Sequence, residues 1–435
     1  MSELVCLKNG SLDKRWLFVP TVFLLSPLVT SAVPRLTWLF LALVAIACCV
    51  RALRLHIEWR QLVPLDVVVI AAFLTAFYVS VNAIWTGAGY DKAALLWALI
   101  LVTIAASTAI AALDQRQLRV AALWFAAGTA VGAAYLVLEL FTKGALTRAA
   151  MNSIAFLQPE NSKHAVISGD YVKKVAISEF NQNATIVMLA LWPALSVCAL
   201  VVKRPRRAFY LTLLFAVVAL AMLLTRAQSS QVALIVSLAV FVFAWKWRKA
   251  AIRILAVLWC LGFVLVLPLD ILAYKSELHM ASWLPNSARA RVIIWEYTAR
   301  QSLNRPWLGV GVDSTRTVKL QGTREQPEGF VFPRSTGSHA HNLFLQTWYE
   351  LGLVGAVLMA FAGAAVALRM QRLPTRIQPF AAASFATFAS IGAFAWSIWQ
   401  TWFLCAIALL IIYVQVAAGA SRDDGSRQAG PETVG

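Results

Sequence analysis

Apolar segments long enough to cross a lipid bilayer recur along most of this 435-residue chain. A helix of about 20 residues spans the hydrocarbon core, and a chain within hydrocarbon must satisfy its backbone hydrogen bonds inside each helix. The composition agrees, because 60% of the residues are hydrophobic and the mean hydropathy is +0.71. We therefore predict an all-α polytopic membrane protein with about 12 transmembrane helices.

The predicted spans form a single transmembrane domain over residues 16–420. They cover residues 16–33, 36–50, 62–81, 93–113, 118–141, 184–202, 208–224, 232–245, 252–274, 343–368, 379–399 and 403–420. Two long polar loops, residues 142–180 and 275–340, interrupt the series. Residues 1–15 precede the first span, and residues 421–435 form a tail rich in Gly, Asp, Arg and Pro that we expect to be disordered.

Lys and Arg outnumber Asp and Glu by 38 to 20, which gives a formal charge of +18. The basic residues gather at both ends of the chain and after every even-numbered span. Basic loops stay in the cytoplasm, so we predict that both termini are cytoplasmic and that the two long loops face outward. Topology explains most of an excess that would suggest nucleic acid in a soluble chain, and no nucleic-acid partner is predicted.

A cleaved signal peptide is the alternative for the first span, because residues 30–32 loosely resemble a cleavage site. Cleavage would remove one span and invert the orientation of the rest. The distribution of basic loops contradicts that orientation.

The longest polar interval of the chain runs from Ser287 to Gly355. Apolar residues within 288–303 recur at helical spacing, which predicts an amphipathic helix at the membrane interface. Arg305-Pro306 would end this helix, and the sequence Gly309-Val310-Gly311 predicts a turn. A passive interfacial helix anchored by its arginines is the alternative.

Arginines on the outward face need an explanation, because outward loops usually contain few cations. Arg226 lies in the tight turn between the seventh and eighth spans, and Arg148 lies in the first long loop. Arg289 and Arg291 belong to the predicted amphipathic helix. Guanidinium groups bind phosphate bidentately, so converging arginines would form a diphosphate site. Snorkelling toward lipid headgroups is the alternative.

Two histidines, His339 and His341, directly precede the tenth span. A neutral imidazole can take a proton from a hydroxyl near pH 7, and a structural role is the alternative. On a helix these two residues would face different ways, so we do not expect them to act as a pair. No Asp or Glu lies within a few residues and the outward face has no Asp-x-Asp motif, so no metal is predicted.

Glu139, late in the fifth span, and Glu350, in the tenth, are acidic residues in apolar surroundings. Carboxylates within membrane helices are usually paired or functional, so both are candidate supporting residues. Glu350 could pair with an arginine or make a hydrogen bond that packs helices together.

The sequence has no Gly-x-x-x-x-Gly-Lys loop and no convincing dinucleotide fingerprint, and we predict no cofactor. Any energy for chemistry must therefore arrive in the substrate. A membrane-borne diphosphate lipid meets that requirement.

Four pieces of the polar interval together resemble the signature of the O-antigen ligase and O-antigen polymerase superfamily. They are Arg291-x-x-x-Trp295, Pro306-Trp307-Leu308-Gly309-Val310-Gly311, His341-Asn342-Leu343-Phe344-Leu345 and Glu350-x-Gly352-x-x-Gly355. The layout also resembles that of the O-antigen ligases within this superfamily. Both have twelve spans, a long periplasmic loop between the ninth and tenth spans, and an arginine after the seventh.

The resemblance implies a GT-C-like glycosyltransferase of the bacterial inner membrane that needs neither metal nor nucleotide. Its donor would be a glycan on undecaprenyl diphosphate, and its acceptor a sugar hydroxyl of lipid A–core on the periplasmic side. His341 would be the general base, and Arg226 and Arg291 would bind the diphosphate. His339 and Arg289 remain alternatives to His341 and Arg291. Arg148 is a further diphosphate candidate by chemistry and placement alone.

Three other functions stay open. An O-antigen polymerase shares the donor and the signature but extends another lipid-linked glycan, and a protein O-glycan ligase would use a Ser or Thr acceptor. A transporter or flippase for lipid-linked glycans would place polar residues along its spans and contain inverted repeats. The polar residues here gather at one face instead, which favours an enzyme.

Overall fold

The computed structural model describes residues 17–53, 66–154, 165–168, 171–316, 324–325, 332–333 and 339–422. The predicted N-terminal segment 1–15 and residues 423–435 of the predicted tail lie outside the described residues. The described chain divides into two compact units, and each is treated by itself. The division passes through helices α4 and α14, so each unit contains one part of both.

The first unit comprises residues up to 62, 103–226 and from 409 onward. Its elements are α1 (Phe18–Ala32), α2 (Thr37–Leu53), the second part of α4 (Tyr90–Ala112), α5 (Gln115–Phe141), α6 (Ala145–Ser153), the strands β1 (Ala165–Ser168) and β2 (Tyr171–Val175), α7 (Asn181–Leu200), α8 (Arg204–Leu224) and the second part of α14 (Thr401–Ala420). Strands β1 and β2 pair antiparallel.

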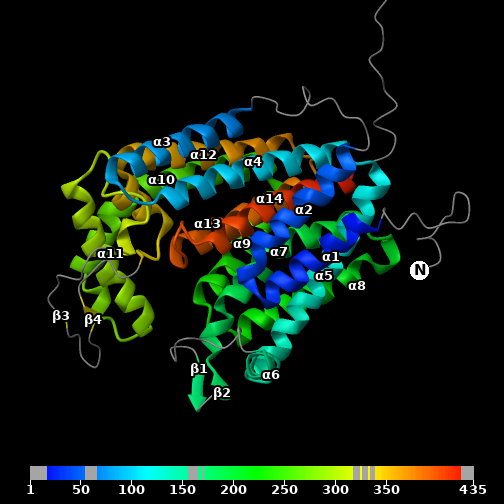
Figure 1. Ribbon diagram of the computed structural model, residues 1–435, viewed down its shortest axis with the longest axis horizontal. Helices are drawn as coiled ribbons and strands as arrows, with labels where there is room; N and C mark the ends of the chain where they lie inside the picture. The colour runs from blue at the N-terminus through cyan, green and yellow to red at the C-terminus, as the bar shows by residue number, and fades with distance from the viewer. Residues whose placement is uncertain are drawn as a thin grey trace, which may run out of the picture. The chain divides into compact units, whose positions relative to one another are not determined.

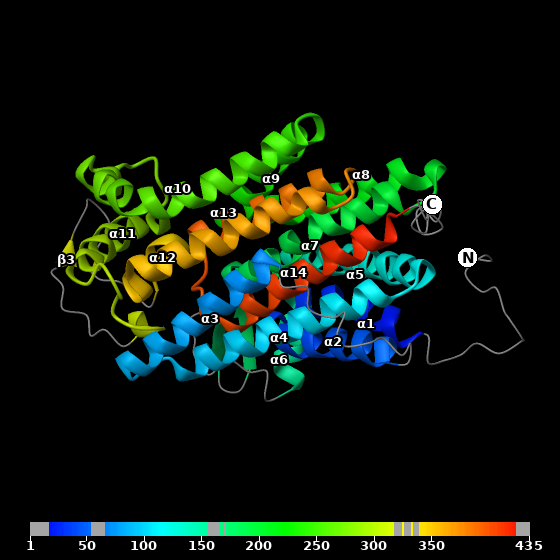
Figure 2. The ribbon, with the colours of Figure 1, turned by 90° about the horizontal axis from the view of Figure 1, so that it is seen from above.

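The second unit comprises residues 63–102 and 227–408. Its elements are α3 (Val67–Thr86), the first part of α4, α9 (Gln228–Lys246), α10 (Arg248–Lys275), α11 (Asn286–Asn304), the antiparallel strands β3 (Arg324–Glu325) and β4 (Phe332–Pro333), α12 (Leu343–Arg369), α13 (Gln378–Phe394) and the first part of α14. Figure 1 shows the elements by their labels, and Figure 2 shows them from above.

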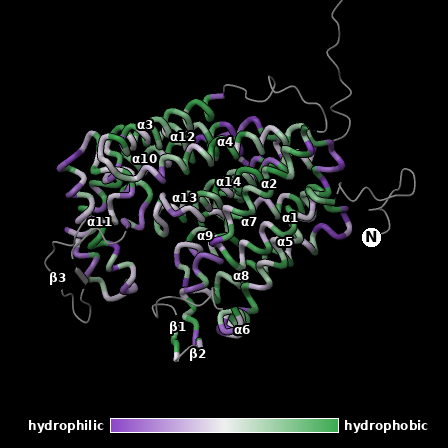
Figure 3. The backbone as a smooth tube through the Cα atoms, viewed as in Figure 1, coloured by the Kyte–Doolittle hydropathy of each residue, from purple (hydrophilic) through white to green (hydrophobic). Residues whose placement is uncertain are grey.

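Each of the twelve predicted spans coincides with a helix, which confirms the all-α polytopic fold. Ten helices in the described residues are long and apolar enough to cross a membrane. The other two predicted spans form α1 and α13, which have 15 and 17 residues. Figure 3 shows the hydrophobic residues along α3, α5 and α14 and more hydrophilic residues on α11.

Close approach of backbones marks the core of the first unit. Helix α5 packs on α1 at Gly128 and Gly132, where a Cβ atom would overlap the Leu24 carbonyl oxygen and the Ser31 hydroxyl. The amide of Asn183 on α7 donates hydrogen bonds to the carbonyl oxygens of Ser31 and Ala32 at the end of α1, at 2.8 and 3.0 Å. These contacts join α1, α5 and α7 through their backbones, as small and polar residues do in membrane helix packing.

In the second unit, α12 packs against α3, α10 and α11. Two indoles connect α12 with α10 through backbone carbonyl oxygens. Trp348 donates to Phe263 at 2.7 Å, and Trp259 donates to Met359 at 3.0 Å. These bonds fix α12 beside α10, and α12 begins immediately after the two candidate histidines.

The tenth predicted span is a helix with a break, which the apolar sequence did not reveal. Gly352 has φ 65° and ψ −163°, far from helical values, and interrupts the α12 hydrogen-bond ladder. Residues 306–311 lie against the break. The N–H groups of Val310 and Gly311 donate to carbonyl oxygens just before the break, those of Tyr349 and Glu350, at 3.0 and 2.9 Å.

The hydrogen bonds after the break run in the opposite direction. The N–H groups of Leu353 and Val354 donate to the carbonyl oxygens of Pro306 and Trp307, at 2.7 and 3.3 Å. Tyr78 on α3 also donates to the Leu351 carbonyl oxygen at 2.7 Å. The loop and α3 thus supply the partners that the broken helix lacks, as irregular backbone at membrane depth requires.

The eleventh predicted span extends beyond the end of the helix to which it corresponds. The prediction ran to Trp399, but α13 ends at Phe394. Residues 395–400 are apolar enough to pass for helix, yet they form an irregular connection to α14. Hydropathy alone cannot distinguish a buried connection from a helix when both are apolar.

Candidate active site

Helix α11 confirms the helix predicted over 288–303 and directs Arg289 and Arg291 apart. Arg289 is buried, and its guanidinium donates to the His279 carbonyl oxygen at 2.8 Å and to the Asn286 side chain at 3.4 Å. Residues two apart on a helix are separated by about 200° around its axis, so Arg291 faces elsewhere. Arg289 therefore braces the start of α11.

Arg291 and Trp295 lie one turn apart on the same face of α11, as the R-x-x-x-W spacing requires. The Trp295 indole donates to the Ala340 carbonyl oxygen at 2.8 Å. Ala340 lies between the two histidines, so this bond ties their segment to α11. Arg291 is close enough to His341 for its charge to lower the pKa of that imidazole. Within the described part of the chain, no ion pair joins Arg291 to a carboxylate.

His341 has a constrained backbone and a defined side-chain partner. Its φ of 54° lies in the left-handed region, which costs a non-glycine residue roughly 1–3 kcal/mol and is concentrated at functional sites. Its Nδ1 lies 2.8 Å from the Ala395 carbonyl oxygen. A carbonyl oxygen only accepts, so Nδ1 donates, and in the neutral imidazole the lone pair is on Nε2.

The surroundings of His341 favour that neutral form. Burial lowers its pKa below the ordinary 6.5, and the nearby Arg291 charge lowers it further, while the bond to Ala395 acts in the opposite direction. Burial also lowers the pKa of Arg291, whose ordinary value lies so far above neutral that it stays cationic. The site therefore places an unprotonated ring nitrogen beside a partly desolvated cation.

His339 lies against His341, with ring centroids 3.8 Å apart and planes tilted by 44°. The expectation that the two would face different ways is wrong, because residues 339–341 are not helical. The left-handed φ of His341 turns the chain so that both rings lie together.

Asn342 explains why α12 starts at once after His341. Its side-chain oxygen accepts hydrogen bonds from the N–H groups of Phe344 and Leu345, at 3.0 and 3.3 Å. An asparagine N-cap satisfies donors that the first helical turn leaves open. The H-N-L sequence thus combines a histidine side chain with a helix start.

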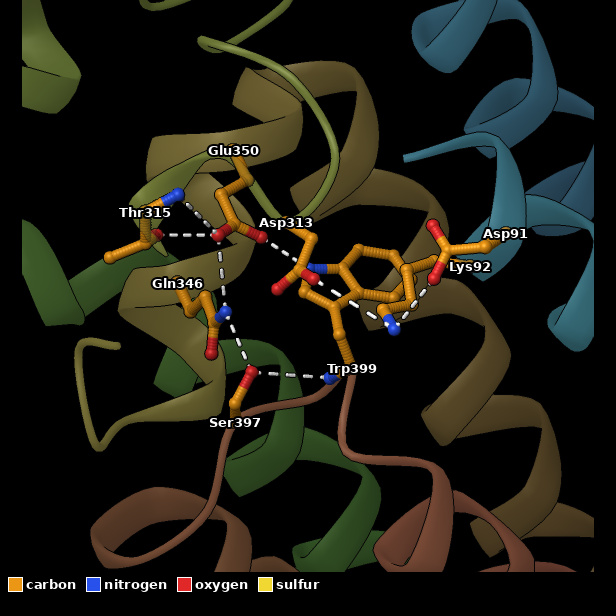
Figure 4. Close-up of polar contacts among 8 residues, drawn as sticks. All are labelled: Asp91, Lys92, Asp313, Thr315, Gln346, Glu350, Ser397 and Trp399. Carbon is orange, nitrogen blue, oxygen red and sulfur yellow. Dashed lines mark hydrogen bonds and ion pairs between the residues drawn. The ribbon is translucent and has the colours of Figure 1, made fainter. Parts of the chain in front are cut away.

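Glu350 is fully buried and accepts hydrogen bonds from three side chains (Figure 4). Thr315 donates through its hydroxyl at 2.5 Å and its N–H at 3.2 Å, and Gln346 donates at 3.2 Å. The Trp399 indole donates to the second carboxylate oxygen. Of the two possibilities open for Glu350, the contacts are hydrogen bonds, which join α12 to Thr315 and to the connection between α13 and α14.

Lys92 is a further cation that the sequence analysis did not name among the basic residues of the outward face. It lies at the start of α4, 2.8 Å from Asp91 and 3.9 Å from Asp313, with a side chain only 16% exposed (Figure 4). Asp313 follows the loop that lies against the α12 break and also has a left-handed φ of 54°. The position of Lys92 in the turn before the fourth span could have identified it from the sequence, because the predicted topology places that turn outside.

The remaining candidates lie in the first unit. Arg226 is exposed in the turn that follows α8 and is the last residue of this unit before residue 227. Arg148 on α6 donates to the carbonyl oxygens of Gly144 and Lys173, at 3.3 and 3.0 Å. Glu139 is buried on α5 and accepts from the Thr147 N–H at 2.8 Å. Arg148 and Glu139 therefore both fasten α6.

Comparison with known proteins bears on the segment that carries this site. Residues 211–360 match the family model described as O-antigen ligase. This part of the chain is similar to the O-antigen ligase family. The family match contains Arg226, Arg291, His341 and Glu350, and leaves Arg148 and Glu139 outside.

Curated relatives agree over a similar length. A protein of Rickettsia typhi, provisionally named a polysaccharide ligase, is 26% identical over 133 residues, 30% of this chain and 32% of that protein. A counterpart from Rickettsia conorii is 28% identical over 121 residues, 27% of this chain and 29% of that protein. The chain thus matches about a third of the length of these curated relatives.

Proposed function

We propose that this protein is a ligase that transfers a glycan from undecaprenyl diphosphate to a sugar hydroxyl of lipid A–core. The reaction would take place at the periplasmic face of the bacterial inner membrane, with both termini in the cytoplasm. The proposal rests on the similarity of residues 211–360 to the O-antigen ligase family and on the local geometry around His341.

One observation carries the proposal. The Ala395 carbonyl oxygen fixes the tautomer of His341 and leaves the Nε2 lone pair available next to Arg291. A general base for a hydroxyl must be unprotonated at the working pH and able to reach the acceptor. A cation at the same place would stabilise the negative charge that develops on a departing diphosphate.

The bond changes follow from these roles. The acceptor hydroxyl oxygen attacks the anomeric carbon, and its proton moves to Nε2 of His341. The bond between that carbon and the diphosphate oxygen breaks, and the electron pair leaves with the diphosphate against Arg291. One displacement inverts the anomeric configuration, and no carboxylate nucleophile is required.

Arg226 enters the proposal as a second diphosphate-binding residue. Its support is its position within the family match and its exposure in the turn after α8. Arginine suits this role because its fork of donors matches phosphate oxygens. No step depends on a metal ion.

The test is reconstitution of the purified protein with an undecaprenyl-diphosphate-linked glycan and lipid A–core in the presence of EDTA. Glycan on the core under chelation is expected. Growth of longer lipid-linked glycans instead would make the protein a polymerase, and transfer to a Ser or Thr peptide would make it a protein ligase. Lipid that crosses the bilayer without any product would support a transporter.

The variant His341→Ala tests the assigned base. We expect turnover to fall by about 10²–10⁴-fold, the usual contribution of a general base, with unchanged elution in detergent. His339→Ala is the comparison, because its ring lies against that of His341. A fully active His341→Ala variant beside an inactive His339→Ala variant would reverse the two roles.

A further inference from the structure

The connection between α13 and α14 supplies the carbonyl group that holds the His341 ring. Ala395 follows the last residue of α13 and has non-helical angles, φ −125° and ψ −73°. Carbonyl groups at a helix end have no partner within the helix. The Ala395 carbonyl finds one in the His341 ring. The position of this connection therefore decides where the imidazole lies.

Gln346 on α12 fastens the connection from one side. Its amide nitrogen donates to the Ser397 hydroxyl at 3.0 Å, and its amide oxygen accepts from the Ile398 N–H at 3.3 Å. Ser397 in turn accepts from the Trp399 N–H at 3.3 Å. Gln346, Ser397 and Ile398 are all buried, so water does not compete for these bonds.

Glu350 sets the orientation of Gln346. One carboxylate oxygen accepts from the same Gln346 nitrogen that reaches Ser397, and the other accepts from the Trp399 indole (Figure 4). A carboxylate only accepts, so the Gln346 nitrogen must point toward it and the amide oxygen toward Ile398. The amide therefore has one orientation, and the connection is held at three successive residues.

We propose that Gln346 and Ser397 are positioning residues that act on His341 through the Ala395 carbonyl. They touch neither substrate nor the reacting atoms. Their effect passes along two residues of backbone, from the pinned Ser397 to the carbonyl that orients the ring. The expected effect on the rate of glycan transfer rests on the proposed function. The expected effect on the titration of His341 does not.

A purely structural role for the same residues makes a different prediction. In that case their loss would lower stability and leave the properties of His341 in the remaining folded protein unchanged. Among the described residues, the titratable and charged groups that face His341 are Arg291 from α11 and His339 from its own segment. Both are left intact by changes at Gln346 or Ser397.

The variants are Gln346→Leu and Ser397→Ala, with Thr347→Val as the matched control. Thr347 is also fully buried on α12, and its hydroxyl bonds to the Leu343 carbonyl oxygen within the helix at 2.8 Å. The control thus removes a buried hydroxyl hydrogen bond beside the network without touching it. Ser397→Ala removes fewer bonds than Gln346→Leu, so it serves if the latter does not fold.

The first measurement is the rate at which diethyl pyrocarbonate modifies His341 as a function of pH, read by peptide mass spectrometry. The reagent reports the unprotonated imidazole and requires no turnover. The bond to Ala395 favours the protonated ring. Loosening it should move the titration of His341 to lower pH in both variants and leave it unchanged in Thr347→Val.

The second measurement is kcat and KM for glycan transfer. A displaced base should lower kcat by about 10–100-fold, since small misplacements of a catalytic group have effects of this order, with little change in KM. A normal titration and normal kcat in folded Ser397→Ala protein would overturn the inference. If wild-type protein shows no transfer but the titrations shift as expected, the proposed function fails and the positioning role stands.

Discussion

His341 and Glu350 lie at the two ends of the first part of α12, and their hydrogen-bonding capacity is used in opposite ways. The Glu350 carboxylate is fully buried and accepts four hydrogen bonds. The His341 ring is half-buried and has one nitrogen held by a carbonyl group. A buried polar group is stable when each of its donors and acceptors has a hydrogen-bond partner. A catalytic group must instead keep one hydrogen-bonding position for its substrate. The comparison separates a residue whose hydrogen bonds build the site from one that we propose acts on the substrate.

The motif pieces of the polar interval divide along the same line. Residues 306–311 and Gly352 form the break in α12 and its partners, close to Glu350. Trp295 and Asn342 fix the segment that carries His341. Changes in the first group should lower the yield of folded protein, and changes in the second should have smaller effects on stability.

The largest effect is expected for Gly352→Ala. The φ of 65° disfavours any side chain, and a Cβ there would overlap the Trp307 carbonyl group. The loss should exceed about 3 kcal/mol, in the range that strain plus overpacking produces. Gly87→Ala is the control, because Gly87 has φ 71° but nothing within 4 Å of an added Cβ. Folded yield and thermal unfolding in detergent distinguish them, and equal losses would show that the loop contact is unimportant.

Arg291→Gln should leave the fold intact and reduce transfer by about 10²-fold, as loss of one group that stabilises transition-state charge does. It should also change the pH dependence. The Arg291 charge lowers the pKa of His341, so its removal raises that pKa. Because the unprotonated ring is the active form, the acidic limb of the rate profile should move to higher pH. Lys174→Gln, which neutralises an exposed cation on β2, should leave the limb in place.

Trp295→Phe should have a smaller effect on both properties. It keeps most of the ring but removes the indole N–H that holds the Ala340 carbonyl oxygen. The bond contributes about 1 kcal/mol to stability, and the freer histidine segment should lower kcat several-fold. Parallel melting and transfer assays measure the two. Unchanged kcat with lowered stability would move Trp295 to the group that builds the site.

Asn342→Ala should have the smallest effect, about 1 kcal/mol from loss of an N-cap. Asn342→Asp keeps the acceptor oxygen and should behave like the wild type. Thermal unfolding of the pair measures the cap. A loss as large as that of Gly352→Ala would mean that the start of α12 matters as much to folding as its break.

Much of the architecture follows from apolar length and periodicity. These signals predicted the twelve helices that coincide with the predicted spans, and they also predicted α11, since both kinds of helix depend on local composition. The break at Gly352 was hidden because the residues around it are as apolar as those of an intact helix. Helix α6 and the β1–β2 hairpin were also missed, since they lie in a loop without long apolar runs.

The site was predictable where a residue's chemistry decides its role and hidden where contacts decide it. His341 and Arg291 were proposed from residue type and their place near the predicted outward loops, and the fold brings the two side chains close together. The distinction between Arg289 and Arg291 needed the fold, because only the contacts with His279 and Asn286 show what Arg289 does. Ala395 could not be found at all, because its contribution is a backbone carbonyl group that carries no sequence signal.

The partners of α12 also fix the order in which the site can mature during synthesis. The break at Gly352 can be sealed as soon as residue 354 has been made, because its loop partners precede it in the chain. The His341 ring must wait for Ala395, and Glu350 must wait for Trp399. A nascent chain can therefore seal the α12 break well before it can orient the His341 imidazole, and the partners of Glu350 are completed only after both.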